Sequence, residues 1–206
     1  MTYAARAVTA RTSQSDPLRI DGVAAGPTSG IIGLTTCPGK NDPAAMTGPW
    51  ARDLGADLAA IRDWGAKTLV TLIEDHEFEL LEVPDLGLRA REVGLAWHPL
   101  PIRDVDVPGE AFEAGWRVEG PALLASLRRG ERIVVHCRGG LGRSGLVAAR
   151  MLVELGVEPR DAINRVRAVR RGAIETRAQE AYVLALAERP CDERVWRQGA
   201  CRQNTQ

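Results

Sequence analysis

A short glycine-rich segment between an apolar run and a helix-like run constrains the fold of this chain more than any other feature. His136–Ser144 contains three glycines, follows Ile133–Val135 and precedes Gly145–Leu155. Glycine lets the backbone curl where a Cβ would clash. A strand-to-helix turn of this kind directs backbone N–H groups and a helix N-terminus toward an anion. The segment therefore predicts an anion-binding loop at the carboxyl end of a strand.

Two reactive side chains, Cys137 and Arg143, stand at the two ends of this loop. A thiolate is a strong nucleophile, but an ordinary cysteine has a pKa of about 8.5 and is only slightly ionised at neutral pH. Lowering such a pKa by ~2–3 units requires ~3–4 kcal/mol of stabilisation. A helix terminus supplies ~0.3–1 kcal/mol, or ~2 kcal/mol where partly buried. We therefore expect the loop N–H groups and the Arg143 guanidinium to supply the rest.

The residue types of the loop suit attack on a phosphate ester. Arg143 has a planar fork that can hold two phosphate oxygens, Ser144 can donate a hydrogen bond to the sulfur, and His136 is expected to be buried and to orient the loop. The phosphate is expected to contact Arg138, Gly139, Gly140, Leu141, Gly142 and Arg143. This pattern predicts a cysteine-dependent phosphatase. A phosphate-binding protein without turnover and a rhodanese-like sulfurtransferase are the alternatives.

Composition limits what else the chain can be. Its 206 residues, 45% of them hydrophobic, suffice for one core. The net charge of zero predicts no attraction to nucleic acid or an acidic membrane. Since no run reaches transmembrane length and no signal peptide is evident, we expect no membrane insertion and a cytoplasmic location. The scattered cysteines and histidines predict no disulfide framework, metal or other cofactor. The oligomeric state is not predicted.

Strand and helix patterns alternate along the chain, which favours a predominantly parallel sheet covered on both faces. We divide the chain into a mobile N-terminal arm (1–25), a phosphatase domain (26–189) and a C-terminal tail (190–206). The expected strands are Gly30–Leu34, Thr68–Ile73, Gly94–Leu100 and Ile133–Val135. The expected helices are Asp53–Trp64, Glu77–Leu81, Leu86–Val93, Glu110–Arg129 with a kink or break at Pro121, Arg143–Leu155, Pro159–Arg170 and Thr176–Glu188. The loop would then lie at the carboxyl end of a central strand.

Several separate stretches resemble the dual-specificity branch of the protein tyrosine phosphatase superfamily, and within it the kinase-associated phosphatase (cyclin-dependent kinase inhibitor) subgroup. They are Gly33–Leu34 with Cys37–Gly39, Pro101–Asp104, His136–Gly145, and Arg171–Thr176 with Gln179 and Tyr182. The resemblance extends over roughly residues 28–186. It implies a compact α/β cysteine-phosphatase fold, with about four to five strands and helices on both faces. It also implies no metal and hydrolysis in two steps through a phosphocysteine.

Such a reaction needs an acid that protonates the leaving oxygen, which in this family is an aspartate on a separate loop. Asp104 matches the subgroup's Pro-Ile-x-Asp pattern and is preferred, with Asp106 as the alternative. The acid then serves as base toward water. The resemblance places Gln179 near the site, where its amide could orient that water. A solvent-facing helix glutamine is the alternative.

Two charged clusters flank these motifs. Glu74–Glu77 is read either as a rim loop that touches substrate or as a plain exposed loop. Arg170 and Arg171 add positive potential at the mouth or form a solvated helix end. We expect a phosphorylated protein or peptide substrate carrying phosphotyrosine, with phosphoserine and phosphothreonine as further substrates. A phosphatase acting on phosphoinositides or other small phosphate esters is one alternative, and a phosphopeptide-binding adaptor with little turnover is another.

Overall fold

The computed structural model describes residues 9–26 and 30–188 of the chain. Its centre is a five-stranded sheet in the order β1-β2-β7-β5-β6. The strands are β1 (Asp21–Ala24), β2 (Ile31–Thr35), β7 (Arg132–His136), β5 (Ala66–Thr71) and β6 (Ala96–Pro99). Only β1 pairs antiparallel within this sheet, and the other neighbours run parallel. The predicted α/β class with a mostly parallel central sheet is confirmed.

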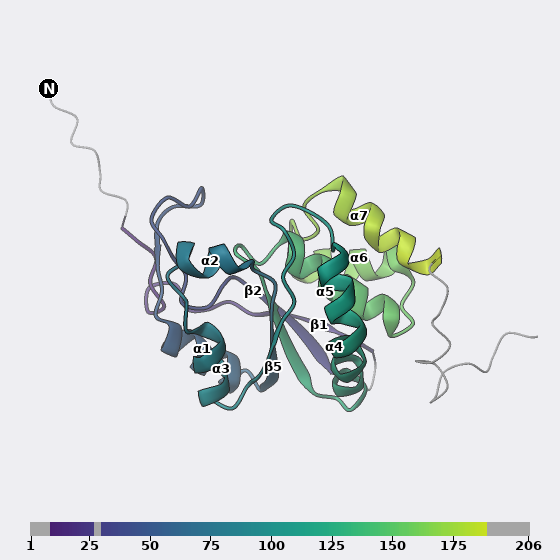
Figure 1. Cartoon of the computed structure of the whole chain (residues 1–206), viewed down its shortest axis with the longest axis horizontal. Coiled ribbons are helices and arrows are strands. Elements are labelled where there is room, and N and C mark those ends of the chain that lie inside the picture. The colour runs from purple at the N-terminus through teal and green to yellow at the C-terminus, as the bar shows by residue number, and fades with distance from the viewer. Residues whose placement is uncertain (1–8, 27–29, 189–206) are drawn as a thin grey trace, which may run out of the picture.

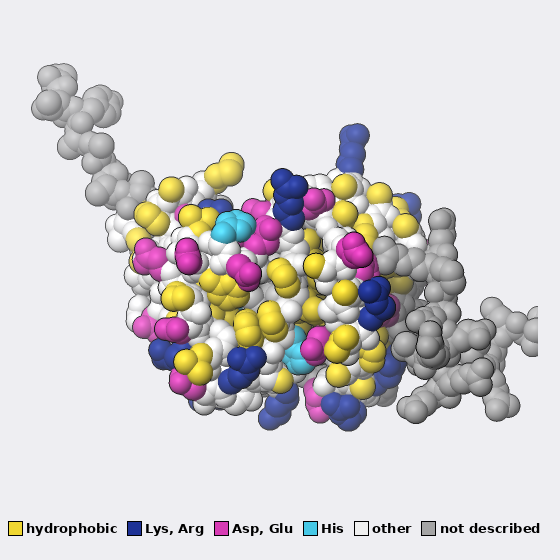
Figure 2. All heavy atoms as spheres, viewed as in Figure 1, with side chains coloured by type: hydrophobic (Ala, Val, Ile, Leu, Met, Phe, Trp, Pro, Cys, Tyr) yellow, Lys and Arg dark blue, Asp and Glu magenta, His cyan; other side chains and the backbone are white. Residues whose placement is uncertain are grey.

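Helices cover both faces of the sheet (Figure 1). One side carries α1 (Leu54–Asp63), α2 (Asp75–Leu80) and α3 (Leu86–Glu92). The other side carries α4 (Glu110–Arg128), α5 (Gly142–Glu154), α6 (Pro159–Val169) and α7 (Arg177–Leu184), which continues into a 3-10 turn, η1 (Ala185–Glu188). On the face drawn in Figure 2, acidic and basic side chains are interspersed around a central area of hydrophobic ones. No helix of the described residues is long and apolar enough to cross a membrane.

The central strand β7 shows why the chain forms this sheet. Its residues Ile133, Val134 and Val135 are fully buried, as expected for a strand with a helical layer on each face. Ile133 and Val135 belong to the core formed with α4 and α5, whereas Val134 belongs to the core formed with α1 and α3. Since side chains alternate along a strand, one short apolar run fills both cores and brings the following loop to the sheet's carboxyl edge.

Some parts of the architecture differ from the expectation. The edge strand β1, expected within the arm, pairs with β2 through Val23 opposite Ile32. Residue Arg11 also bonds to the chain around Trp50, where β3 (Asn41–Asp42) and β4 (Trp50–Ala51) form a small ribbon. The folded part therefore begins before residue 26. Residues 1–8 of the expected arm and the whole expected tail lie outside the described residues.

Of the kink or break expected at Pro121, the break does not occur: α4 is a single helix through this residue. Proline has no N–H, so the carbonyl of Arg117 loses its usual helical partner. Both Arg117 and Pro121 are exposed, and water can therefore satisfy that carbonyl. The opposite face of α4 packs Phe112 and Trp116 into the core, which holds the helix together across the proline.

Candidate active site

The glycine-rich loop connects β7 to α5, and two of its glycines are required by the space around them. Gly140 has φ +73°, and a Cβ at this position would lie 2.4 Å from the Thr35 carbonyl oxygen. A Cβ at Gly142 would lie 2.3 Å from Oε2 of Glu175. By contrast, a Cβ at Gly139 would have no atom within 4 Å. The loop is therefore pressed between β2 on one side and the start of α7 on the other.

Cys137 lies at the floor of this loop and is 4% exposed. The Gly140 N–H donates to its sulfur over 3.2 Å. Its Sγ lies 3.6 Å from Ser144 Oγ, close enough for a hydrogen bond in either direction. A thiolate would accept from both groups, since an N–H and a hydroxyl can each donate to it.

The loop carbonyls are bonded to groups outside the loop. Arg170 Nε donates to the Gly140 carbonyl over 2.5 Å and its Nη2 to the Gly139 carbonyl over 3.5 Å. The Arg138 carbonyl accepts from Thr36 Oγ1 over 2.8 Å. Because the C=O and N–H of one peptide unit point in opposite directions, the outward carbonyl of Gly139 fits the inward N–H of Gly140 that reaches the sulfur. Arg170, expected at a mouth or a helix end, thus holds the loop's shape.

Arg143 is 1% exposed and is fixed from several sides. Glu77 accepts from Nη1 over 2.5 Å and from Nη2 over 2.9 Å. Nη1 also donates to the Ile102 carbonyl over 3.1 Å. Its Nε is the one buried side-chain nitrogen or oxygen of the described residues that lacks a hydrogen-bond partner. A buried donor without a partner is expensive, so this nitrogen marks a place for an acceptor such as a phosphate oxygen.

The Glu77–Arg143 pair is charged on both sides. Burial alone would raise the pKa of Glu77, but the bonds from Arg143 and from the Glu74 N–H outweigh it and lower the pKa. Burial alone would lower the pKa of Arg143, whereas the Glu77 bond and the nearby Cys137 raise it. The guanidinium therefore stays positive at any pH the protein meets.

The two candidate acids lie differently in their shared loop. Asp104 Oδ1 lies 2.9 Å from Arg143 Nη2, and its side chain is 52% exposed. The Asp106 carboxylate accepts from the Val107 N–H of its own loop over 2.8 Å. The Asp106 carbonyl accepts from Gln179 Nε2 over 3.1 Å. The structure therefore brings the Asp104 carboxylate to the arginine, and it uses Asp106 to anchor the loop.

His136 is fully buried at the end of β7. Burial, with the charge of Arg143, lowers the pKa of His136 to about 4, although its bond to the Cys137 carbonyl raises it. The imidazole is therefore neutral at pH 7. Its Nδ1 lies 3.4 Å from that carbonyl oxygen and its Nε2 lies 2.8 Å from Thr71 Oγ1. Since a carbonyl can only accept, we place the single proton on Nδ1, and the Thr71 hydroxyl donates to Nε2.

Two further expected residues have partners outside the loop. The Arg138 side chain reaches Asp42 over 2.9 Å, so it points out of the loop and only its backbone remains there. Gln179 is fully buried, and its Oε1 accepts from the Glu175 N–H over 2.9 Å at the start of α7. Because its Nε2 also donates to the Asp106 carbonyl, Gln179 joins α7 to the loop that contains Asp104 and Asp106. It does not face solvent.

Glu77 is expected either in a rim loop that touches substrate or in a plain exposed loop, whereas the structure buries it and gives it the shortest contact with Arg143. The sequence holds one signal for its position, because Glu74 and Glu77 form a capping box at the start of α2, the spacing typical of a helix N-terminus. Nothing in the sequence pairs that helix with a residue 66 positions later. Within the described residues, no group of three His, Cys, Asp or Glu side chains could hold a metal ion.

A central parallel sheet whose middle strand leads into a loop with cysteine and arginine at its ends defines the architecture of cysteine-dependent phosphatases. A family model described as "Polymorphic toxin system, DSP-PTPase phosphatase" matches residues 44–157. The chain therefore belongs to this family of dual-specificity and tyrosine phosphatases, which confirms the resemblance found in the sequence.

Curated relatives agree with this assignment. Cyclin-dependent kinase inhibitor 3 of Rattus norvegicus is 31% identical over 135 residues, which cover 64% of this chain and 62% of that protein. A probable protein tyrosine phosphatase type IVA A of Dictyostelium discoideum is 32% identical over 83 residues, which cover 40% of this chain and 49% of that protein. The match thus spans about three fifths of the length of the first relative.

Solved structures share the fold. A crystal structure of kinase associated phosphatase, with serine in place of its catalytic-site cysteine, has a TM-score of 0.73 at 26% identity and covers 84% of this chain and 95% of that chain. Tk-PTP in its active form has a TM-score of 0.58 at 26% identity and covers 80% of this chain and 99% of that chain.

Proposed function

We propose that the protein is a cysteine-dependent protein phosphatase that hydrolyses phosphotyrosine, with phosphoserine and phosphothreonine as further substrates. The observation that carries the proposal is the loop with Cys137 at one end and Arg143 at the other. The buried Nε of Arg143 has no hydrogen-bond partner within the described residues. A phosphoryl group in the loop would supply the missing acceptor. The reducing conditions of the cytoplasm suit an enzyme that needs a free thiol.

The reaction proceeds in two displacements. The Cys137 thiolate attacks phosphorus, so that a P–S bond forms and the P–O bond to the substrate breaks. Asp104 gives its proton to the leaving oxygen. Water then attacks the phosphocysteine, Asp104 takes a proton from that water, and the P–S bond breaks to release phosphate and the thiolate. Ser144 Oγ, 3.6 Å from the sulfur, stabilises the departing thiolate by a hydrogen bond.

Arg143 and Asp104 change partners during this cycle. Arg143 Nη2 now contacts Asp104 over 2.9 Å, and a bidentate phosphate on Nε and Nη2 needs the same donor. Binding of the phosphoryl group therefore displaces Asp104 from Arg143 and frees its carboxyl group for the leaving oxygen. Glu77 keeps the guanidinium in place throughout, since it holds both Nη atoms.

The test is phosphate release from a small aryl phosphate and from a panel of phosphopeptides, with reductant and chelator present. We expect turnover by the native protein and none by Cys137→Ser. Asp104→Asn should lose more activity on poor leaving groups than on good ones. Asp106→Asn is the matched control and should lose far less.

The outcome also separates the alternatives. Phosphopeptide binding without any phosphate release by the native protein would show an adaptor. Phosphate release from phosphoinositides or small esters that is clearly faster than from every phosphopeptide would contradict the proposal that the substrate is a phosphorylated protein. Turnover that survives in Cys137→Ser would contradict the thiol mechanism itself.

A further inference from the structure

A valine in a left-handed backbone conformation lies directly after the candidate acid Asp104. Val105 has φ +60°. The Asp106 N–H donates to the Arg103 carbonyl over 3.2 Å and closes a four-residue turn, which we call the acid turn (Arg103–Asp106). Of the two central residues only Val105 has a positive φ, as in a type II turn, whose third residue is usually glycine or asparagine. A β-branched residue in this position is an outlier.

Burial does not compensate Val105 for this conformation. The described residues include two other non-glycine residues with positive φ, Glu82 at +56° and Ile174 at +59°. Ile174 is 2% exposed and packs in the core formed with α4 and α5, and Glu82 accepts from the Asn41 amide. Val105 is 60% exposed, so its side chain gains little from the folded state. Strained residues of this kind cluster at functional sites.

The acid turn is held in its conformation from two sides. The Asp104 N–H donates to Oε2 of Glu74, the N-cap residue of α2, over 3.3 Å. The Asp106 carbonyl accepts from Gln179 Nε2 of α7 over 3.1 Å. Bonds from two separate helices thus impose the shape of the turn on Val105, and a strained conformation persists only where its surroundings fix it in this way.

One carboxylate oxygen links Val105 to Arg143. Asp104 Oδ1 accepts from the Val105 N–H over 3.0 Å, and the same Oδ1 lies 2.9 Å from Arg143 Nη2. The conformation that strains Val105 is therefore the one that places Asp104 on the arginine.

We propose that Val105 is a positioning residue whose strained backbone weakens the contact between Asp104 and Arg143, so that a phosphate can displace Asp104 from the arginine. This inference rests on the proposed function. When Asp104 Oδ1 leaves Arg143, the Val105 N–H loses the same acceptor and the acid turn relaxes. The strain therefore acts on the closed arrangement alone, and it shifts the balance toward the arrangement in which Arg143 is open to phosphate and Asp104 is free for the leaving oxygen.

Two substitutions separate this strain from a contact between the Val105 side chain and the ligand. Asparagine adopts a left-handed conformation more readily than most residues, so Val105→Asn relieves the strain. Threonine is β-branched like valine, so Val105→Thr keeps it. Both changes remove the apolar surface of an exposed side chain, and neither disturbs the core.

The first measurement is the binding of inorganic phosphate to the Cys137→Ser variant of the full chain, followed by NMR titration, with and without a change at Val105. We expect Val105→Asn to weaken phosphate binding about fivefold, because the apparent affinity falls with the fraction of molecules in the open arrangement. Val105→Thr should bind phosphate as Cys137→Ser alone does. Glu82→Asn is the matched control, a change at another exposed left-handed residue, and should keep the affinity within about twofold.

Thermal unfolding of the same variants should change in the opposite direction. Val105→Asn should raise the midpoint of unfolding by about 2–4 °C, and Val105→Thr should leave it unchanged. A residue with a purely structural role would not combine a gain in stability with a loss of phosphate binding.

A third background tests the link through Asp104. Asp104→Ala removes Oδ1, and with it both the contact to Arg143 and the bond from the Val105 N–H. In Cys137→Ser with Asp104→Ala, the further change Val105→Asn should alter the phosphate affinity by less than about twofold. With Cys137 intact, Val105→Asn should raise KM for an aryl phosphate about fivefold and change kcat by less than about twofold, because the closed arrangement competes with substrate binding.

The outcomes are distinct. Equal phosphate affinity with Val105 and with asparagine in its place would overturn the proposal. So would Val105→Thr binding as weakly as Val105→Asn, since that result would indicate a side-chain contact, and so would a fivefold loss that persists in Asp104→Ala. A native protein that releases no phosphate, while the Cys137→Ser series shows the expected affinities, would refute the proposed function and support the role of Val105. Turnover by the native protein with equal affinities in that series would support the proposed function and overturn the role of Val105.

Discussion

Arg143 is held by Glu77 at both Nη atoms, while its buried Nε has no hydrogen-bond partner in the part of the chain that the structure describes. An arginine side chain has four rotatable bonds before its rigid guanidinium, and ordering it loses side-chain entropy. Here the hydrogen bonds to Glu77 already order Arg143 in the folded protein, so a ligand would not have to order it. The position of Arg143 is therefore fixed by the fold itself, which is the preorganisation that stabilises developing charge in an enzyme site.

Glu77→Gln should weaken both the fold and the reaction. The substitution leaves Arg143 buried without its counter-ion, and breaking a buried pair typically destabilises by about 3–5 kcal/mol. We expect a loss of about 3 kcal/mol in the free energy of unfolding, measured with urea. The second-order rate constant on an aryl phosphate should fall about tenfold or more. Glu79→Gln, the same change at an exposed position of α2, should leave both within error. Equal behaviour of the two variants would show that Glu77 does not position the arginine.

Gly140→Ala and Gly139→Ala test how tightly the loop is packed. At Gly140 the new Cβ would meet the Thr35 carbonyl at 2.4 Å, with φ at +73°. A left-handed alanine alone is unfavourable by about 1–2 kcal/mol, so we expect a total loss above about 2 kcal/mol in thermal or urea unfolding. At Gly139 a Cβ has open space, and the loss should stay below about 0.5 kcal/mol. A similar small loss at both positions would contradict the packing of the loop against β2.

The strand, loop and helix around Cys137 and Arg143 could be predicted from the sequence because their residues are consecutive. The pairing of Glu77 with Arg143 could not be predicted, since 66 residues separate them. Local patterns carry no information about which distant side chains meet. Asp104 and Asp106 could not be separated by pattern beyond a short motif, because their difference lies in the direction of each carboxylate.

At the scale of elements, long periodic segments were predictable and short ones were not. The strand around Ile133–Val135 and the helix after the loop follow from continuous apolar runs. β1 has a single buried residue, Val23, so it has no pattern to recognise until β2 is beside it. The two-residue strands β3 and β4 are likewise defined by their pairing. Tertiary context decides such elements.

Arg150 joins three helices and offers a test at this scale. It is 6% exposed, lies 2.9 Å from Glu113 of α4 and 2.7 Å from Glu154 of α5, and donates to the Tyr182 hydroxyl of α7. Arg150→Ala removes these buried charge-assisted contacts between α4, α5 and α7, so we expect a loss of about 3 kcal/mol in the free energy of unfolding.

The control for Arg150 is Arg165→Ala, which removes an exposed ion pair with Asp161 on α6. Exposed pairs of this spacing contribute about 0.3–0.5 kcal/mol, and the loss should not exceed that. A loss at Arg150 no larger than at Arg165 would mean that the four helices on this face are held by apolar packing alone.

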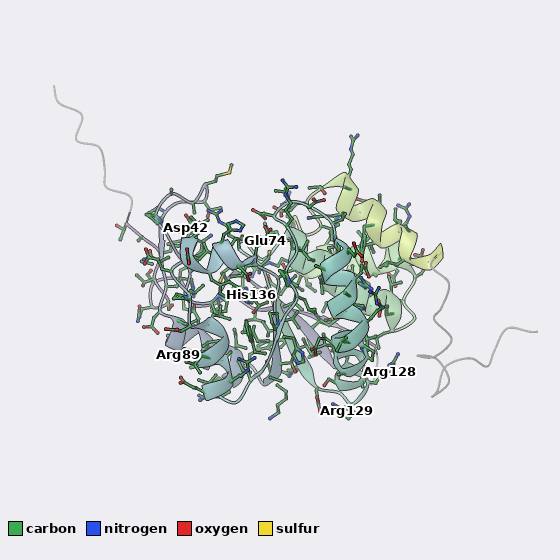
Figure 3. The ribbon with its side chains drawn as sticks, in the orientation of Figure 1. Asp42, Glu74, Arg89, Arg128, Arg129 and His136 are labelled. Carbon is green, nitrogen blue, oxygen red and sulfur yellow. The ribbon has the colours of Figure 1, made fainter. Side chains whose placement is uncertain are left out.

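At the scale of the whole molecule, the sheet separates two cores, and the loop sits where β7 emerges between them. His136 is the last residue of β7 and lies near the middle of the molecule (Figure 3). Its burial therefore links global stability to pH. The unfolded chain binds a proton at His136 with a pKa near 6.5, whereas burial keeps the pKa in the folded protein at about 4.

Between pH 6.5 and 4 the unfolded state binds more protons than the folded state, so stability must fall as the pH falls through this window. The full difference is roughly 3 kcal/mol, at about 1.4 kcal/mol for each unit of pKa. Glu77 adds a second loss at lower pH, because its pKa is lowered in the folded protein and its contribution disappears below the unfolded value of 4.5.

Urea unfolding at half-unit steps from pH 7.5 to 4 measures this slope, and carbon-13 histidine spectra of the folded protein measure its cause. The chain has three histidines, and one of them should remain neutral down to about pH 4, with His76→Gln and His98→Gln assigning the other two resonances. A fold whose stability is flat between pH 6.5 and 4.5, or three histidines that all titrate near 6.5, would contradict the burial of His136. If the slope is present, acid weakens the strand from which the Cys137–Arg143 loop emerges, because protonated His136 could no longer accept a hydrogen bond from the Thr71 hydroxyl at Nε2.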